Sequence, residues 1–119
     1  MNKIRARAVM EEATRIVLGR IARTGWPEHD GEPCAADVNS GRCVEWAELV
    51  CAAVPGTQMV EWDDPASQLL HTFVYWQDRW YDAERPDGAA DVTGLPIFHR
   101  YPGTRIEGAI HPSGSGEQT

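Results

Sequence analysis

Residues 71 to 84, HTFVYWQDRWYDAE, constrain the fold more than any other stretch of the chain. β-Branched and aromatic residues dominate both halves, which is typical of β-strands, and Gln77-Asp78 forms a short turn between them. Side chains alternate between the two faces of a strand, so a turn of two residues places His71 on the same face as Asp82 and Glu84. The stretch therefore predicts an antiparallel hairpin that brings a histidine close to an acid.

Two helices are expected before this hairpin. Residues 3–23 carry apolar side chains at mixed three- and four-residue spacing, and Thr24-Gly25 and Pro27 end the segment. Residues 43–53 have a second apolar stripe that begins at Cys43, and Pro55-Gly56 stops it. The stripe expected to face the core in the first helix consists of Ile4, Ala8, Ala13, Ile16, Val17 and Ile21.

The other segments complete the prediction of an α+β domain. Residues 26–42 are interpreted as a loop, residues 57–62 as a first strand, residues 85–96 as a loop and residues 97–101 as a last strand. The N-terminal helix and the helix that begins at Cys43 are expected to pack on a small antiparallel sheet. A chain of 119 residues fits one domain, assigned to residues 1–110, with a flexible tail at residues 111–119.

The charge distribution argues against nucleic-acid binding. The net charge is −7, yet six of the eleven basic residues and only two of the eighteen acidic residues lie in residues 1–23. An acidic body is a poor nucleic-acid binder, because phosphate contacts need clustered positive charge. The basic first helix is expected to be solvated and to face the acidic body; the alternative is that it binds an acidic protein partner.

Hydropathy predicts a cytoplasmic protein with no membrane contact. No apolar run approaches the roughly eighteen residues needed to span a bilayer. The first 25 residues have charges throughout and lack the apolar core of a signal peptide. Three cysteines (Cys34, Cys43, Cys51) form no disulfide-scaffold pattern and would be free thiols in a reducing compartment.

Cys43, His71 and Asp82 together suggest a nucleophilic thiol. A helix N-terminus favours the thiolate through its unpaired N–H groups and its dipole, and a nearby imidazolium adds a second positive charge. His71 could supply that charge and later protonate a leaving amine, while Asp82 would orient the ring. Glu84 is the competing candidate for the orienting role.

An acyl-transfer reaction also needs donors for its oxyanion. The backbone N–H of Cys43 is the first candidate, and the side chain of Asn39 or a neighbouring loop amide is the second. Arg42 and Trp80 are further candidates for substrate binding, since one precedes the thiol and the other could line a cleft. No cofactor is expected, and the substrate would be a peptide or a protein.

These motifs resemble the core of the transglutaminase-like and papain-like cysteine enzymes. Asn39-Ser40-Gly41-Arg42-Cys43, His71-Thr72-Phe73-Val74 and Trp80-Tyr81-Asp82 are the matching segments, so the resemblance covers residues 39–84. The chain also resembles small cysteine-enzyme-like proteins of phages and bacteria, but this resemblance is looser. It implies a peptidase, an amidase or deamidase, or a transamidating enzyme. Two positions depart from the pattern: Val44 replaces the usual aromatic residue after the thiol, and Asn39 stands where papain-like enzymes have glutamine.

Two other interpretations remain open. His29, Cys34, Cys43 and Cys51 are zinc-ligand types, but their spacing matches no CxxC or HExxH motif. Alternatively, the chain keeps the scaffold without the chemistry and acts as a protein-binding or inhibitor module.

Overall fold

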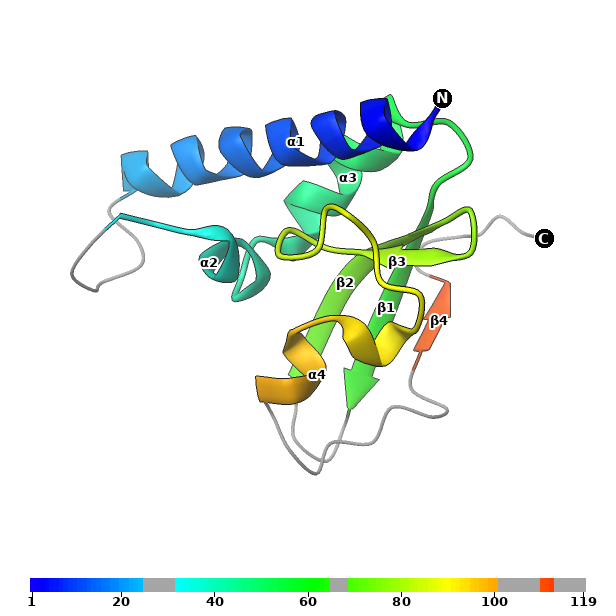
Figure 1. Ribbon diagram of the computed structural model, residues 1–119. Coiled ribbons are helices and arrows are strands. Elements are labelled where there is room, and N and C mark those ends of the chain that lie inside the picture. The colour runs from blue at the N-terminus through cyan, green and yellow to red at the C-terminus, as the bar shows by residue number, and fades with distance from the viewer. Residues whose placement is uncertain (25–31, 65–68, 101–109, 113–119) are drawn as a thin grey trace.

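The computed structural model describes residues 1–24, 32–64, 69–100 and 110–112. Four helices, one 3₁₀ turn and four strands follow one another within these ranges (Figure 1). The helices are α1 (Lys3–Thr24), α2 (Ala35–Asn39), α3 (Cys43–Ala53) and α4 (Ile97–Arg100). The strands are β1 (Gln58–Asp64), β2 (Leu69–Trp76), β3 (Arg79–Tyr81) and β4 (Ile110–Pro112), and the 3₁₀ turn is η1 (Val92–Gly94). The fold is a small α+β fold.

The sheet is antiparallel, with strand order β3-β2-β1-β4. The expected hairpin is present: Tyr75 pairs with Trp80 across a turn at Gln77 and Asp78. Both turn residues have positive φ, at 49° and 62°, as a two-residue turn matching the strand twist requires. The predicted register is therefore correct, and His71, Phe73 and Tyr75 share one face of β2.

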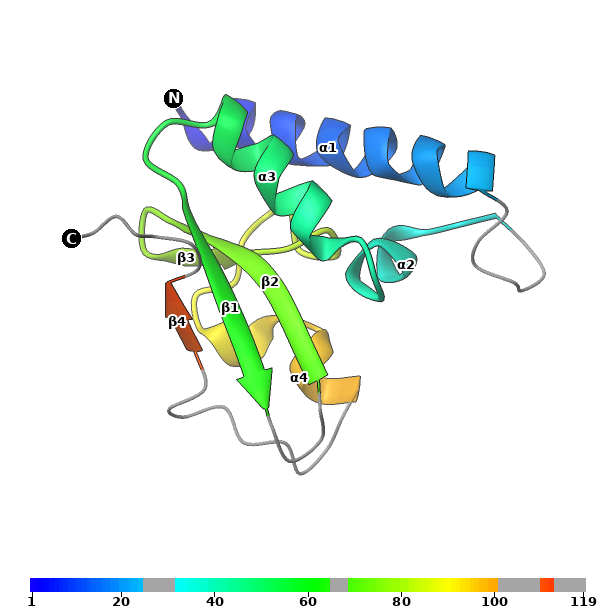
Figure 2. The same cartoon turned by 180° about the vertical axis from the view of Figure 1, so that it is seen from behind.

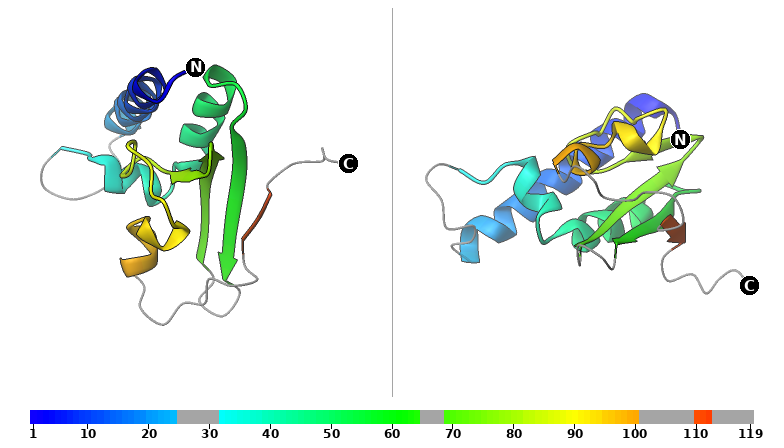
Figure 3. Two further views of the ribbon diagram at one scale, coloured as in Figure 1. Left: turned by 45° about the vertical axis from the view of Figure 1, so that its right-hand side comes forward. Right: turned by 90° about the horizontal axis from the view of Figure 1, so that it is seen from below.

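Helices cover both faces of the sheet. Figure 2 shows α3 lying across one face, and Figure 1 shows η1 and α4 on the opposite face. The view from below in Figure 3 shows the strands between α3 on one side and the segment with η1 and α4 on the other. One apolar cluster joins α1, α2 and α3 to Val74, Trp76 and Tyr81, and the other joins Leu95, Ile97 and Phe98 to Val60, Trp62 and Phe73.

Helix α1 buries a different stripe from the one expected. Its buried residues are Ala6, Met10, Ala13, Val17 and Ile21, which follow a regular spacing of three or four. Ala13, Val17 and Ile21 were predicted correctly. Ile4 is 85% exposed, Ile16 is 38% exposed and Ala8 also faces outward.

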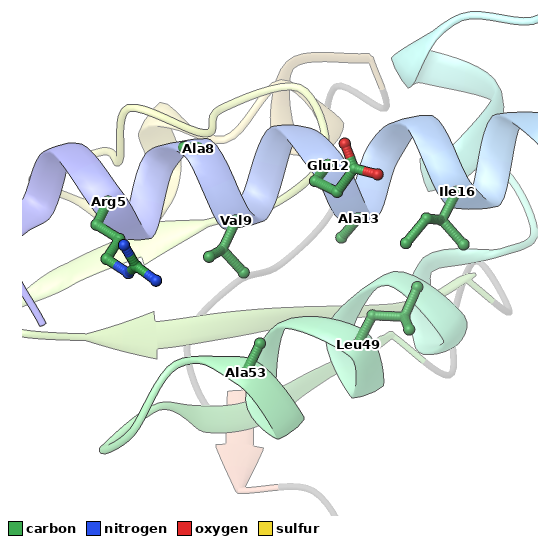
Figure 4. Close-up of a pocket in the computed structure, with 8 residues that line it drawn as sticks. All are labelled: Arg5, Ala8, Val9, Glu12, Ala13, Ile16, Leu49 and Ala53. Atoms are coloured by element: carbon green, nitrogen blue, oxygen red, sulfur yellow. The ribbon is translucent and has the colours of Figure 1, made fainter.

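An apolar groove with a volume of about 440 Å³ lies between α1 and α3. Figure 4 shows Val9, Ala13, Leu49 and Ala53 pointing into the space between the two helices. The groove contains none of the residues predicted to perform chemistry.

Three local predictions were wrong. Residues 97–100 form α4 rather than a strand, because Pro96 starts a helical turn and its carbonyl accepts the N–H groups of His99 and Arg100. The segment 26–42 contains helix α2, where the Cys34 N–H is capped by the Asp37 carboxylate at 2.7 Å. Residues 111 and 112 pair with β1 rather than starting a tail, whereas residues 113–119 lie outside the described residues.

None of the helices in the described ranges combines the length and the hydropathy that a membrane-spanning helix needs.

Candidate active site

The site lies at the edge of β2, beyond the point where β3 ends. Alternate residues of an antiparallel strand direct their N–H groups to the same side, and the last pair of the hairpin is Val74 with Tyr81. Thr72 therefore has an N–H aimed at the open side of β2. Cys43, the first residue of α3, fills this position, and its Sγ accepts the Thr72 N–H at 3.4 Å.

His71 lies beside this thiol and is completely buried. Its ring stacks on Phe73 with 5.5 Å between the ring centroids, which fixes the ring plane. Nε2 lies 3.3 Å from Asp82 Oδ2. Nδ1 is buried and forms no well-aligned hydrogen bond with any described residue, so this nitrogen is the one available to the thiol.

Asp82 is held by its own turn. The chain leaves β3 after Tyr81, and Asp82 Oδ1 accepts the N–H groups of Glu84 at 2.9 Å and Arg85 at 3.1 Å. This arrangement is an Asx turn, in which an aspartate side chain caps the next residues of its own backbone. Because Oδ1 is used in this way, Oδ2 is held toward His71. Asp82 is completely buried, as expected for an acid that serves an internal partner.

Cys43 and His71 shift each other's pKa in the direction of an ion pair. Burial raises the pKa of the Cys43 thiol, but the hydrogen bond and charge of His71 and the N–H groups of Thr72 and Cys43 lower it, with a net lowering. Burial lowers the pKa of His71, but the hydrogen bonds and charges of Asp82 and Cys43 together raise it to about 9. At neutral pH this favours a thiolate beside an imidazolium.

A pocket of about 330 Å³ opens on the thiol. Asn39, Ser40 and Gly41 line its polar side, just before Cys43. Its apolar side comes from three elements: Val44 in α3, Leu70 in β2 and Ile97 in α4. The pocket gives a small molecule or a short chain segment access to a nucleophile that is itself 8% exposed.

Glu84 does not contact His71, although the hairpin parity placed it on the same face. Its Oε1 accepts the Asn39 amide Nδ2 at 2.8 Å and is also bound by Arg100 Nη2. Glu84 therefore joins α2 to α4 across the site. The contact uses one of the two N–H groups of the Asn39 amide.

Arg42 and Trp80 contact other parts of the molecule. Arg42 Nη1 pairs with Glu45 at 2.7 Å and Trp80 packs on Tyr75 and Phe73, with ring centroids 4.5 and 5.9 Å apart. Neither is among the described residues that line the pocket.

Sequence reasoning missed Leu70, Ile97 and Arg100. Leu70 directly precedes His71, and that adjacency was a usable signal. The other two were hidden because residues 97–101 were assigned to a strand.

The described part of the chain does not support the zinc interpretation. There, no group of three or more His, Cys, Asp or Glu side chains gathers in a way that could hold a metal ion. His29, which the interpretation included, lies outside the described residues. The three cysteines are free thiols, with Cys34 exposed and Cys51 partly buried.

Comparison of the chain with protein-family models, curated proteins and solved structures gives no match.

Proposed function

We propose that the protein is a thiol-dependent acyl-transfer enzyme in which Cys43 is the nucleophile, His71 the acid and base, and Asp82 the orienting acid. The observation that carries the proposal is the linked burial of these three groups. A buried histidine and a buried carboxylate cost several kcal/mol of desolvation, and a simple structural contact seldom requires them. Strongly perturbed groups at a pocket are typical of catalytic sites.

The chemistry proceeds in two steps. Cys43 Sγ attacks the acyl carbon and forms a thioester, the bond to the leaving group breaks, and the His71 imidazolium gives its proton to that group. Water or an amine then attacks the thioester, His71 takes up the proton of this nucleophile, and the thiolate is released. His71 Nδ1 is assigned to these proton transfers, because Nε2 faces Asp82.

The oxyanion needs donors at the entrance to α3. The Cys43 N–H is at the first turn, where helical amides lack intrahelical partners. The second N–H of the Asn39 amide is the other donor, since Asn39 lines the same pocket and its first N–H binds Glu84. Together they would stabilise the charge that develops on the acyl oxygen.

The proposal includes a compact papain-like or transglutaminase-like core and a peptide or protein substrate. Support comes from a thiol at a helix start, a histidine on a strand and an acid directly after the next strand. Three free thiols suit a reducing compartment such as the cytoplasm. Hydrolysis, deamidation and transamidation share this first half-reaction, and they differ in the nucleophile that resolves the thioester.

The test is covalent capture with p-nitrophenyl acetate. We expect one equivalent of nitrophenolate in a burst at pH 7, and intact mass with peptide mapping should place one acetyl group on Cys43. Cys43→Ala should abolish the burst and keep the native circular dichroism spectrum. Acetylation of Cys34 or Cys51 at the same rate as Cys43 would refute the proposal.

A further inference from the structure

Two of the aliphatic side chains that line the pocket are exposed to solvent, whereas such side chains are usually buried. Val44 is 44% exposed and Leu70 is 59% exposed, while Ile97 forms the floor at 6%. The other large apolar side chains exposed in the described residues are Met1, Ile4 and Ile16, all in or next to α1. Apolar groups that remain open beside a nucleophile are typical of a surface that a ligand covers.

Ionisable groups are rare in the pocket. Cys43 is the one ionisable residue among the described residues that line it, and Asn39, Ser40 and Gly41 are neutral. The Glu84 carboxylate, which contacts Asn39 in this lining, is also bound by Arg100. A charged group that entered the pocket would lose hydration and find no free counter-ion among the described residues that line it, which is costly.

The volume limits the size of the bound group. A pocket of about 330 Å³ is at the small end of ligand sites. It suits a short acyl chain whose carbonyl oxygen lies toward Asn39 and the start of α3. The chain beyond the carbonyl would then lie against Leu70 and Val44.

We infer that the acyl group accepted by Cys43 is uncharged and aliphatic, and that Leu70 and Val44 select it. This rests on the proposed function and specifies its substrate class. The corresponding natural donor has a small branched or straight aliphatic side chain next to the carbonyl that reacts. In the acylation step, a bond forms between Sγ and the carbonyl carbon, and the bond from that carbon to the leaving group breaks.

Three p-nitrophenyl esters test the inference: the acetate, the 3-methylbutanoate and the hemisuccinate. The rate constant for acylation of Cys43 is divided by the rate constant of each ester with 2-mercaptoethanol, which removes differences in intrinsic reactivity. We expect the normalised rate of the 3-methylbutanoate to exceed that of the acetate by about tenfold or more, as apolar pockets discriminate between small groups. The hemisuccinate should react more slowly than the acetate.

Leu70→Lys supplies the sharper test, because the Leu70 side chain is 59% exposed and a lysine there need not bury its charge. The preference should invert, with the hemisuccinate now faster than the 3-methylbutanoate. Ile4→Lys is the matched control, since Ile4 is exposed on α1 and belongs to no part of the site. It should keep the wild-type order of rates.

The outcomes separate the inference from the function on which it rests. If the three normalised rates agree within twofold, or if Leu70→Lys leaves their order unchanged, the substrate class is wrong while Cys43 is still acylated. If no ester acylates Cys43 faster than the background measured with Cys43→Ala, both the proposed function and the inference are wrong.

Discussion

Asp82 and Glu84 have different roles, although the sequence did not show which of them would orient His71. Asp82 faces the His71 ring, and Glu84 binds Asn39 and Arg100. Both were placed on the face of His71, and parity could not separate them. Continuing the hairpin register past Val74–Tyr81 would set Glu84 directly opposite His71. The chain instead turns at Asp82, whose Oδ2 faces the ring, and Glu84 is carried to Asn39. The parity was predictable, but the Asx turn that decides between the two acids depends on backbone geometry.

Asp82→Asn tests the role of the charge. The asparagine Oδ1 can still accept the N–H groups of Glu84 and Arg85, so the turn is kept while the negative charge is lost. The pKa of His71 should then fall, the ion pair with Cys43 should weaken, and the rate of nitrophenolate release at pH 7 should drop about 10²-fold or more. An NMR titration of the His71 ring measures the pKa directly.

Asp78→Asn is the control for this substitution. Asp78 accepts the Tyr75 hydroxyl at 2.9 Å in the exposed hairpin turn and has positive φ, which asparagine tolerates. It should leave the rate unchanged. An equal loss of rate in both variants would show that the His71–Asp82 contact has no special role.

At the scale of elements, substituting alanine for Gly88 and for Gly19 should change the free energy of unfolding in opposite directions. Gly88 has a φ of +85°, and an added Cβ would come within 2.7 Å of the Tyr81 ring. Gly88→Ala should therefore lower the free energy of unfolding by about 2 kcal/mol. Gly19 lies in α1, where a Cβ would meet only the flexible end of Arg23 at 3.7 Å. Gly19→Ala should raise stability by about 1 kcal/mol.

Urea denaturation followed by tryptophan fluorescence measures both effects. The Gly88 substitution disturbs the loop whose Ala89 is bonded to Trp80 through both backbone groups, at 2.8 and 2.9 Å. It should thus also slow acylation of Cys43, since Asp82 follows that strand directly. Destabilisation by Gly19→Ala would contradict the packing of α1 described above.

Element prediction succeeded where one signal dominated. Helix α3 was predicted with the correct residues and the hairpin with the correct turn, since a single apolar stripe and a two-residue turn leave few alternatives. The strand bounds differ, because β2 begins at Leu69 and β3 ends at Tyr81 rather than at Glu84. Residues 97–101 look like a strand by composition, and a proline at position 96 together with packing of Phe98 on Trp62 overrode that propensity. In α1, apolar residues occupy more than one face, so the positions of the elements packed against it, α2 and α3 among them, decide which face is buried.

At the scale of the whole molecule, the layers on the two faces of the sheet both contribute residues to the site. Cys43 comes from the layer formed by α1 and α3, whereas Ile97 and Arg100 come from the layer formed by η1 and α4. The relative position of these layers depends on long-range packing. A single sequence contains no direct signal for such packing, which explains why the apolar side of the pocket was not predicted.

Phe98→Ala tests this coupling. The ring of Phe98 packs edge-on against Trp62 with centroids 5.0 Å apart, and the residue is 8% exposed. Its removal should cost about 3 kcal/mol of unfolding free energy. Since α4 would also lose its anchor, the preference for the 3-methylbutanoyl ester should diminish in the fraction that remains folded. Loss of stability with an unchanged preference would mean that α4 does not contribute to the pocket.

Competitive alkylation of the three thiols tests the central claim most directly. The native protein is treated with iodoacetamide between pH 5.5 and 10, and the rate at each cysteine is read by peptide mass spectrometry, with His71→Ala in parallel. The lowered pKa of Cys43 and the pKa of His71 near 9 place the thiolate–imidazolium pair between these two values. At pH 7 Cys43 should therefore react faster than Cys34 and Cys51, and its rate should fall only when the pH drops through its lowered pKa. In His71→Ala, Cys43 should react only at the alkaline pH at which an ordinary buried thiol loses its proton. A Cys43 rate no greater than those of Cys34 and Cys51 at pH 7, or one unaffected by His71→Ala, would contradict the account.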